Sequence, residues 1–245
     1  MKRRPPGSRA ARRTRRGPKT LAIDVGGSGV KAAVLDARGR IVGDRVRVKT
    51  PARCPPSVLV RAIVGLVAPL AAYDRVSVGF PGFVRDGVIH TAPNFGSAKW
   101  HGFDLTRSLT RALKRPVRVL NDAEVQGFGV VTGKGIELVV TLGTGFGSAL
   151  FRDGELMPHL ELSQHPVHGG KTYDQYLGDR ARRRVGARKW NRRVRRVLGI
   201  LETVVNYDRL HVGGGNAARI DFAIGRRAST VDNKAGLLGG IALWR

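Results

Sequence analysis

Short apolar runs separated by polar turns alternate with longer apolar patterns of helical spacing along the first half of the chain. An apolar run of four to eight residues between turn residues is typical of a buried strand, whereas apolar residues at every third or fourth position indicate a helix. The resulting order, β-β-β-α-β-α-β, defines a first lobe over residues 20–122. The pattern predicts strands at about 20–25, 29–36, 40–48, 75–80 and 117–120, and helices at about 57–70, from Asp104 to about 113, and after Asp122.

The second half repeats this plan and defines a second lobe, residues 123–245. Leu138–Leu150 follows the pattern of Leu21–Ala33 at a distance of 117 positions. Two similar hairpins half a chain apart predict a duplicated α/β domain, with the hairpins facing each other across a cleft. The pattern also predicts a helix over about 188–205, a strand over 207–212 and a closing helix over 235–243.

Glycine-rich turns join the first two strands of each lobe. Asp24 precedes the first turn, and Thr141 is its counterpart before the second. Glycine permits positive φ and leaves backbone N–H groups uncovered, which suits a phosphate group, and an acid beside such a turn can hold a divalent metal through water. Either turn alone could be an ordinary hairpin, and neither fits the P-loop or Rossmann pattern. The bare-backbone positions are Gly26, Gly27, Ser28 and Gly29, then Gly143, Thr144 and Gly145, and a third group at Gly213, Gly214 and Gly215.

Positive charge is in large excess, with 44 basic against 18 acidic side chains and a net charge of +26. Nine basic residues and no acid lie in residues 1–19, which we expect to form a disordered arm, and the rest of the chain still carries +17. Ten more lie between Arg180 and Arg196, again without an acid. Such a field attracts polyanions, so this segment favours a polyanion groove, although a compositional bias towards arginine would look the same.

Cysteine content and hydropathy limit the cellular location. A single cysteine, Cys54, excludes an internal disulfide framework and a cysteine-rich zinc site. No apolar run approaches the roughly 20 residues of a membrane span, and no apolar segment follows the basic arm as a secretory signal would require. We therefore expect a cytoplasmic protein that does not enter a membrane.

Four motifs in fixed order make the chain resemble the ROK family of sugar kinases, which belongs to the superfamily of actin and hexokinase. They are Asp24-Val-Gly-Gly-Ser-Gly-Val-Lys31, Leu120-Asn-Asp-Ala123, Leu142-Gly-Thr-Gly145 and His211-Val-Gly-Gly-Gly215. The resemblance extends from about Thr20 to the C-terminus. Within the family the chain resembles the polyphosphate glucokinases most, which share Ser28, Phe80-Pro81-Gly82 and the run 141–150.

The resemblance implies an actin/hexokinase-like (ribonuclease H-like) fold and phosphoryl transfer from inorganic polyphosphate, with Mg²⁺, to the 6-hydroxyl of glucose. Asp122 would be the general base, because a sugar hydroxyl is a poor nucleophile until its proton is taken. Asp24 would approach the Mg²⁺, and Lys31 and Thr141 would join the glycine turns around the donor phosphates. A homodimer is also implied. The positions implied at the sugar are Gly82, Asn94, Lys99, Trp100, Asn121, Glu161 and His165.

Two departures from the family pattern leave alternatives open. Most ROK kinases carry Glu-x-Gly-His at the sugar and then a cysteine-rich zinc loop; here Gln164 stands at the histidine position, with His165 one residue later, and the zinc cysteines are missing. Either Gln164 or His165 could contact the sugar. The donor could also be ATP, or either compound. A sugar-responsive DNA-binding regulator would need a helix-turn-helix that residues 1–19 cannot supply, so specific nucleic-acid binding is not expected.

Overall fold

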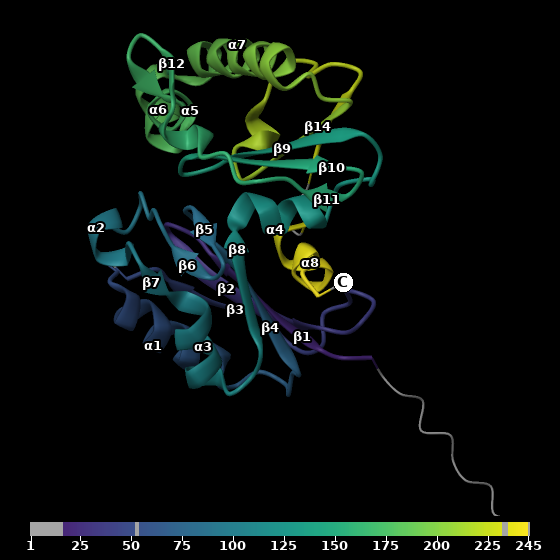
Figure 1. The fold of residues 1–245 in the computed structure, drawn as a ribbon. Coiled ribbons are helices and arrows are strands. Elements are labelled where there is room, and N and C mark those ends of the chain that lie inside the picture. The colour runs from purple at the N-terminus through teal and green to yellow at the C-terminus, as the bar shows by residue number, and fades with distance from the viewer. Residues whose placement is uncertain (1–16, 52–53, 232–234, 245) are drawn as a thin grey trace, which may run out of the picture.

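Two five-stranded sheets form two lobes, one above the other in Figure 1. The computed structural model describes residues 17–51, 54–231 and 235–244. The first sheet has the strand order β3-β2-β1-β4-β8, and the second has the order β11-β10-β9-β14-β15. In each sheet, adjacent strands among the first three of this order are antiparallel, and the last two strands run parallel to the third. The duplication expected from the sequence is therefore present in the topology.

The first lobe contains most of the elements predicted for it. Helices α1 and α3 pack beside one another and supply Leu59, Ile63 and Leu109 to a core whose other side is the first sheet. Its elements are β1 (Thr20–Val25), β2 (Gly29–Leu35), β3 (Val46–Lys49), α1 (Pro56–Val67), β4 (Arg75–Phe80), β5 (Val84–Arg85), β6 (Val88–Ile89), α2 (Ser97–Trp100), β7 (Phe103–Asp104), α3 (Leu105–Leu113), β8 (Val117–Asn121) and α4 (Asp122–Phe128).

The predicted strand at 40–48 is only partly correct. The Asp36 carboxylate accepts hydrogen bonds from the backbone N–H groups of Arg38 and Arg40, so the chain turns there, and Gly43 has a φ of +79°. Apart from a single bridge between Leu35 and Ile41, pairing with β2 resumes only at Val46. Backbone hydrogen bonds still join Asp36 to Arg40 and Val42 to Val34, so the pairing is interrupted only between Val42 and Val46, around Gly43.

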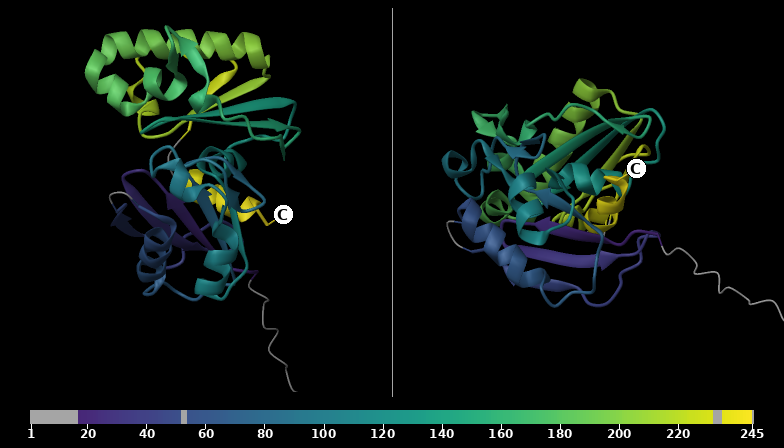
Figure 2. Two further views of the ribbon diagram at one scale, coloured as in Figure 1. Left: turned by 60° about the vertical axis from the view of Figure 1, so that its left-hand side comes forward. Right: turned by 60° about the horizontal axis from the view of Figure 1, so that its bottom comes forward.

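The second lobe is built around one long amphipathic helix, α7. Trp190, Val194 and Leu201 pack with residues of the second sheet, while the basic residues Arg188, Lys189 and Arg192 are exposed. Figures 1 and 2 show α7 on the side of this sheet away from the first lobe. The elements of this half of the chain are β9 (Ile136–Leu142), β10 (Phe146–Arg152), β11 (Glu155–Leu156), the 3₁₀ turn η1 (Leu162–Gln164), β12 (Pro166–His168), β13 (Lys171–Thr172), α5 (Tyr173–Leu177), α6 (Asp179–Val185), α7 (Ala187–Val205), β14 (Arg209–Gly213), η2 (Ala217–Arg219), β15 (Ala228–Thr230) and α8 (Ala235–Ala242).

Helix α8 differs from the predicted lobe boundaries. The sequence interpretation places it in the second lobe, yet it packs on β1, β4 and α4 of the first lobe. The hydroxyl of Ser77 donates to the carbonyl of Gly240 at 2.5 Å, and a Cβ at Gly240 would lie 3.2 Å from the Cβ of Ala22. The glycine thus permits the helix to approach the sheet. The chain ends by returning to the lobe in which it began (Figure 1).

The basic arm lies almost wholly outside the described residues. Of the predicted segment 1–19, the structure describes only Gly17, Pro18 and Lys19. Lys19 is held in place, because its backbone N–H donates to the Asp74 carboxylate at 2.7 Å and its carbonyl accepts from the Asp74 N–H. Within the described ranges, no helix combines the length and apolar character needed to cross a membrane.

Candidate active site

A cavity of about 120 Å³ lies between the lobes. The parallel strands β4 and β8 end at this cleft, where the carboxyl ends of strands commonly carry ligand sites. The first lobe contributes residues from these strand ends, and the second lobe contributes its hairpin turn and the segment after β11. The sequence-predicted residues that line the cavity are Gly26, Gly27, Gly82, Asn94, Asn121, Asp122, Thr141, Gly143, Thr144, Gly145 and Glu161.

Asp122 is the first residue of α4 and faces this cavity. Removal from water raises the pKa of its carboxyl group to about 7, and the negative charge of Asp24 adds to this effect, followed by those of Glu161 and Glu124. The backbone N–H of Ala123, which donates to the carboxylate at 2.8 Å, opposes the shift only in part. A carboxylate with a pKa near the working pH is suited to accept a proton during a reaction.

Asn121 fixes the position of Asp122 by capping α4. Its side chain accepts from the Ala123 N–H at 2.9 Å, while Glu124 accepts from the Asn121 N–H at 3.0 Å, which completes a capping box. The Asn121 amide also donates to the carbonyl of Gly82 at 3.0 Å. This hydrogen bond links the end of β8 to the residues that follow β4, next to Asp122.

His159 lies between two carboxylates, those of Glu124 in α4 and Glu161 after β11. Its Nδ1 is 2.7 Å from Glu124, its Nε2 is 3.5 Å from Glu161, and its ring stacks on Phe83 with centroids 4.7 Å apart. Burial disfavours the charged ring, but hydrogen bonds to the two carboxylates outweigh it and raise the pKa to about 9. A positively charged His159 thus holds the segment after β11 against α4. The sequence interpretation gave this histidine no defined role.

Glu161 presents an ionised carboxylate to the cavity. Burial alone would raise its pKa, but hydrogen bonds from His159 and Ser163 lower it. Ser163 donates to one carboxylate oxygen at 2.5 Å and Thr91 to the other at 3.3 Å. An anionic acceptor held from three sides is suited to receive hydrogen bonds from vicinal hydroxyl groups.

Asp174 is a further acid at the cavity, which the sequence interpretation missed. It accepts from the backbone N–H of Phe146 at 2.6 Å and lies 3.5 Å from the amide of Gln164. Burial raises its pKa to about 6. The sequence feature that could have pointed to Asp174 is the capping box of Thr172 and Gln175, which places Asp174 in the first turn of a helix. Its proximity to β10 depends on tertiary structure.

A second cavity, of about 730 Å³, adjoins the first and is lined by the glycine turns of both lobes. Asp24 lies in its wall, 3.2 Å from the ammonium group of Lys31. Asp122 and Thr141 line both cavities, as do Gly26, Gly27, Gly143 and Thr144, so Asp122 lies where the two cavities meet. The other basic and glycine positions in this wall are Arg47, Arg180, Arg183, Gly29, Gly214 and Gly215, and Ser28 is also part of it.

The two hairpin turns are similar but not identical. Val25 pairs with Val30 across a four-residue turn, whereas Leu142 pairs with Phe146 across three residues. The Gly26 N–H donates to the Gly29 carbonyl, and the Gly143 N–H donates to that of Gly145. The geometric counterpart of Gly145 is therefore Gly29 rather than Ser28, the counterpart expected from the sequence.

Close approach, not positive φ, explains Gly29 and Gly145 among the glycines of these turns. None of them adopts the left-handed region. A Cβ at Gly145 would lie 2.5 Å from the Asp174 carboxylate, and one at Gly29 would lie 2.9 Å from the Arg47 guanidinium. In the third glycine group, Gly214 has a φ of +85° and lies against the backbone of Leu142.

Comparison with known proteins identifies the family. Residues 20–158 match the ROK family. This chain belongs to the ROK family. It is 32% identical over 211 residues to polyphosphate glucokinase from Mycobacterium tuberculosis (strain H37Rv), covering 82% of this chain and 79% of that protein. Polyphosphate glucokinase from Mycobacterium leprae is 29% identical over 235 residues, covering 89% of this chain and 72% of that protein.

Solved structures of ROK proteins confirm the actin/hexokinase-like fold. The inorganic polyphosphate/ATP-glucomannokinase from Arthrobacter sp. strain KM superposes with a TM-score of 0.83 at 32% identity, covering 94% of this chain and all of that chain. A ROK glucokinase from Streptomyces griseus, in complex with glucose and AMPPNP, superposes with a TM-score of 0.74 at 20% identity, covering 92% and 98%. The resemblance inferred from the motifs is thus confirmed, and the chain is a sugar-kinase homologue.

Four positions suggested by the ROK motifs lie elsewhere. Trp100 is fully buried among aromatic side chains and donates its indole N–H to the Cys54 carbonyl, so it belongs to the first core. Lys99 and His165 are exposed and line neither cavity. Gly213 packs against the Gln126 side chain instead of facing the cleft. The family resemblance implied each of these positions, but a resemblance in sequence does not determine the direction of a side chain.

Gln164 is better placed towards the site than His165. Its amide donates to the Ser163 hydroxyl at 3.0 Å, and that hydroxyl holds Glu161. The 3₁₀ turn η1 directs Gln164 towards Asp174, while the chain leaves the turn at His165 in an extended conformation. Both side chains are exposed and line neither cavity, but Gln164 contacts Ser163 and Asp174, which line the smaller one.

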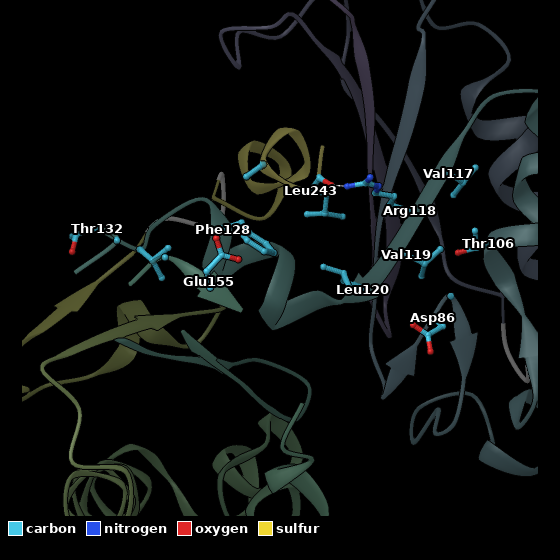
Figure 3. Close-up of a pocket in the computed structure, with 15 residues that line it drawn as sticks. Asp86, Thr106, Val117, Arg118, Val119, Leu120, Phe128, Thr132, Glu155 and Leu243 are labelled. Carbon is cyan, nitrogen blue, oxygen red and sulfur yellow. Dashed lines mark hydrogen bonds between the residues drawn. The ribbon is translucent and has the colours of Figure 1, made fainter. Parts of the chain in front are cut away.

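A larger cavity of about 810 Å³ lies on a different face, between β8, the end of α4 and the C-terminal turn (Figure 3). Figure 3 shows Asp86, Thr106 and Val119 on one side of it and Phe128 and Glu155 on the other. Neither the glycine turns nor Asp122 line this cavity. This cavity is larger than the one between the lobes. The smaller inter-lobe cavity is nevertheless the candidate active site, because several acidic side chains and the glycine turns converge on it.

Proposed function

We propose that this ROK protein transfers the terminal phosphoryl group of inorganic polyphosphate to the 6-hydroxyl of glucose and releases glucose 6-phosphate. The observation that carries the proposal is the position of Asp122, with a pKa of about 7, at the junction of a small polar cavity and a larger cavity lined by bare backbone and basic residues. The polyphosphate glucokinases at about 30% identity support the same donor and acceptor.

In this proposal glucose occupies the small cavity. Glu161 and Asp174 accept hydrogen bonds from the sugar hydroxyls, Asn94 and Asn121 supply amide groups, and the 6-hydroxyl lies against Asp122. Asp122 takes the hydroxyl proton as the oxygen forms its bond to the terminal phosphorus. The phosphoanhydride bond breaks at the same centre, and the shortened polymer leaves with the electron pair.

The donor phosphates occupy the larger cavity. Bare backbone at Gly26–Gly29 and at Gly143 and Thr144 faces them, with Lys31 alongside. Asp24 suits Mg²⁺, because this ion is commonly bound by one or two carboxylates together with substrate phosphates. The described residues contain no cluster of three or more His, Cys, Asp or Glu side chains that would hold a metal by itself. When bound, Mg²⁺ would neutralise charge on the phosphate oxygens.

A comparison of donors tests the proposal. Purified protein is given glucose and Mg²⁺ with either polyphosphate or ATP, and glucose 6-phosphate is measured. We expect product with polyphosphate; product with ATP alone would overturn the choice of donor. Activity with both would establish a dual-donor enzyme, a candidate favoured by similarity to the polyphosphate/ATP-glucomannokinase. No product with either donor would indicate a sugar-binding regulator instead.

Two further properties come from the sequence: one from the family resemblance, the other from cysteine content and hydropathy. We propose a homodimer and a cytoplasmic location, as the sequence interpretation expects. Light scattering of the purified protein, compared with the chain mass of 26.5 kDa, tests the first. Fractionation of the source cells tests the second.

A further inference from the structure

A basic surface covers the outside of the second lobe next to the cleft. We define the α6–α7 surface as Arg180, Arg183, Arg184, Arg188, Lys189 and Arg192, all of which are exposed. The other basic residues in this stretch have internal partners: Arg182 pairs with Asp179, Arg193 is buried against Tyr176, Arg195 lies over Phe222 and Arg196 bonds to His168.

The charges of the α6–α7 surface are poorly neutralised by the protein. Only Arg183 forms an ion pair among the described residues, with Asp179 at 2.7 Å. Arg188 and Arg192 are four residues apart on one helix, where like charges repel each other. A helix face that served only solubility would interleave both signs, as solvated helices commonly do. This surface therefore fits a multivalent anion.

The α6–α7 surface is continuous with the donor cleft. Arg180 and Arg183 line the cleft beside Gly143 and Gly214. Helix α6 is attached to the second glycine turn, because the Asp179 N–H donates to the carbonyls of Gly143 and Thr144 at 3.0 and 3.2 Å. Gly186, with a φ of +78°, then leads directly into α7, and Figure 1 shows α6 on the side of α7 that is nearer the first lobe.

We propose that the part of a long polyphosphate chain that projects beyond the cleft runs over α6 and along the exposed face of α7. The inference rests on the proposed function and adds a second binding region for the same substrate. On α7 the residues of this surface, Arg188, Lys189 and Arg192, lie within the first two turns, so the polymer follows α6 and the N-terminal end of α7. A linear phosphate polymer needs cationic contacts only. Nucleic acids held as single strands also use exposed aromatic side chains for base stacking, and Trp190, the aromatic residue of α7, is buried.

The test compares donors of two lengths in a charge-removal variant. The triple variant Arg188→Gln, Lys189→Gln and Arg192→Gln leaves every residue of the cleft in place. With a short chain that the cleft alone can hold, we expect unchanged kcat and KM. With a long chain we expect KM to rise about tenfold at low salt, because exposed ionic contacts are individually weak and three are lost. The salt dependence of the long-chain KM should also become less steep.

The matched control removes three positive charges from the first lobe. Arg61→Gln, Arg107→Gln and Arg111→Gln lie on the exposed faces of α1 and α3, away from α7 (Figure 1). We expect this variant to keep the long-chain KM of the parent. Equal effects in both triple variants would show that net charge alone matters and would overturn the proposal. An unchanged long-chain KM in the α7 variant would overturn it as well.

Two outcomes separate this inference from the proposed function. If the parent protein makes no glucose 6-phosphate with polyphosphate of any length, the proposed function fails, and this inference fails with it. If the parent is active but duplex or single-stranded DNA displaces long polyphosphate as effectively as more polyphosphate does, the surface is a general nucleic-acid face. That result would overturn the inference and leave the proposed function intact.

Discussion

The pKa of Asp122 determines how the proposed reaction responds to pH. A pKa of about 7, set first by burial and then by the charge of Asp24, leaves the carboxyl group half ionised at neutral pH. About nine-tenths of the molecules carry the ionised base at pH 8 and about one-tenth at pH 6, so kcat/KM for glucose should fall roughly tenfold across that interval. A carboxylate with the ordinary value of 3.8 would give no change there.

Replacement of His159 should move this profile. Glu124 and Glu161 both raise the pKa of Asp122, and His159 places a positive charge between them. We expect His159→Gln to raise the pKa of Asp122 further and shift the acid limb to higher pH.

The assay measures initial rates of glucose 6-phosphate formation from pH 5.5 to 9 with saturating donor. The donor phosphates also titrate, so the residual rate of Asp122→Asn at each pH serves as the control. The ratio of the two rates isolates the ionisation of Asp122. A ratio that stays constant between pH 6 and 8 would refute the role of Asp122 as a base with a raised pKa.

Two further predictions concern stability. Gly145→Ala should lower the free energy of unfolding by about 1–3 kcal/mol, because its Cβ would lie 2.5 Å from the Asp174 carboxylate. In Gly143→Ala the added Cβ meets nothing within 4 Å, so the free energy of unfolding should change by less than about 1 kcal/mol. Urea unfolding measures both variants, and equal losses would contradict this explanation. The raised pKa of His159 stabilises the folded protein by up to about 3 kcal/mol below pH 6.5, and this contribution should be lost as pH rises through about 9. Unfolding of the parent and of His159→Gln at pH 6.5 and 9.5 measures it, and an equal pH effect in both would contradict it.

The sequence predicted the parts of the fold that depend on local patterns. The repeat of the hairpins indicated two lobes, and the described residues contain two five-stranded sheets with equivalent strand order. Asn121 and Asp122 follow a strand and precede a helix, so their place at a cleft edge could be predicted. Turn length was harder to predict, because aligned glycines do not show that one turn has four residues and the other three.

The remaining features depend on contacts between distant segments. Asp174 reaches the cavity because it accepts from Phe146, 28 residues earlier, and His159 becomes charged only when Glu124 lies beside it. The apolar pattern predicts that α8 is a helix, but it does not say which sheet the helix covers. Trp100 was misplaced for the same reason, since an aromatic residue near a polar loop can serve the core as readily as a sugar.

The most direct test of the central claim is a crystal structure of Asp122→Asn with glucose and a short polyphosphate bound together. The account predicts the glucose O6 within about 2.6–3.2 Å of the residue 122 side chain. It also predicts the terminal phosphate between Gly26–Gly29 and Gly143–Gly145. Glucose bound away from residue 122, or phosphate bound outside the two turns, would contradict it.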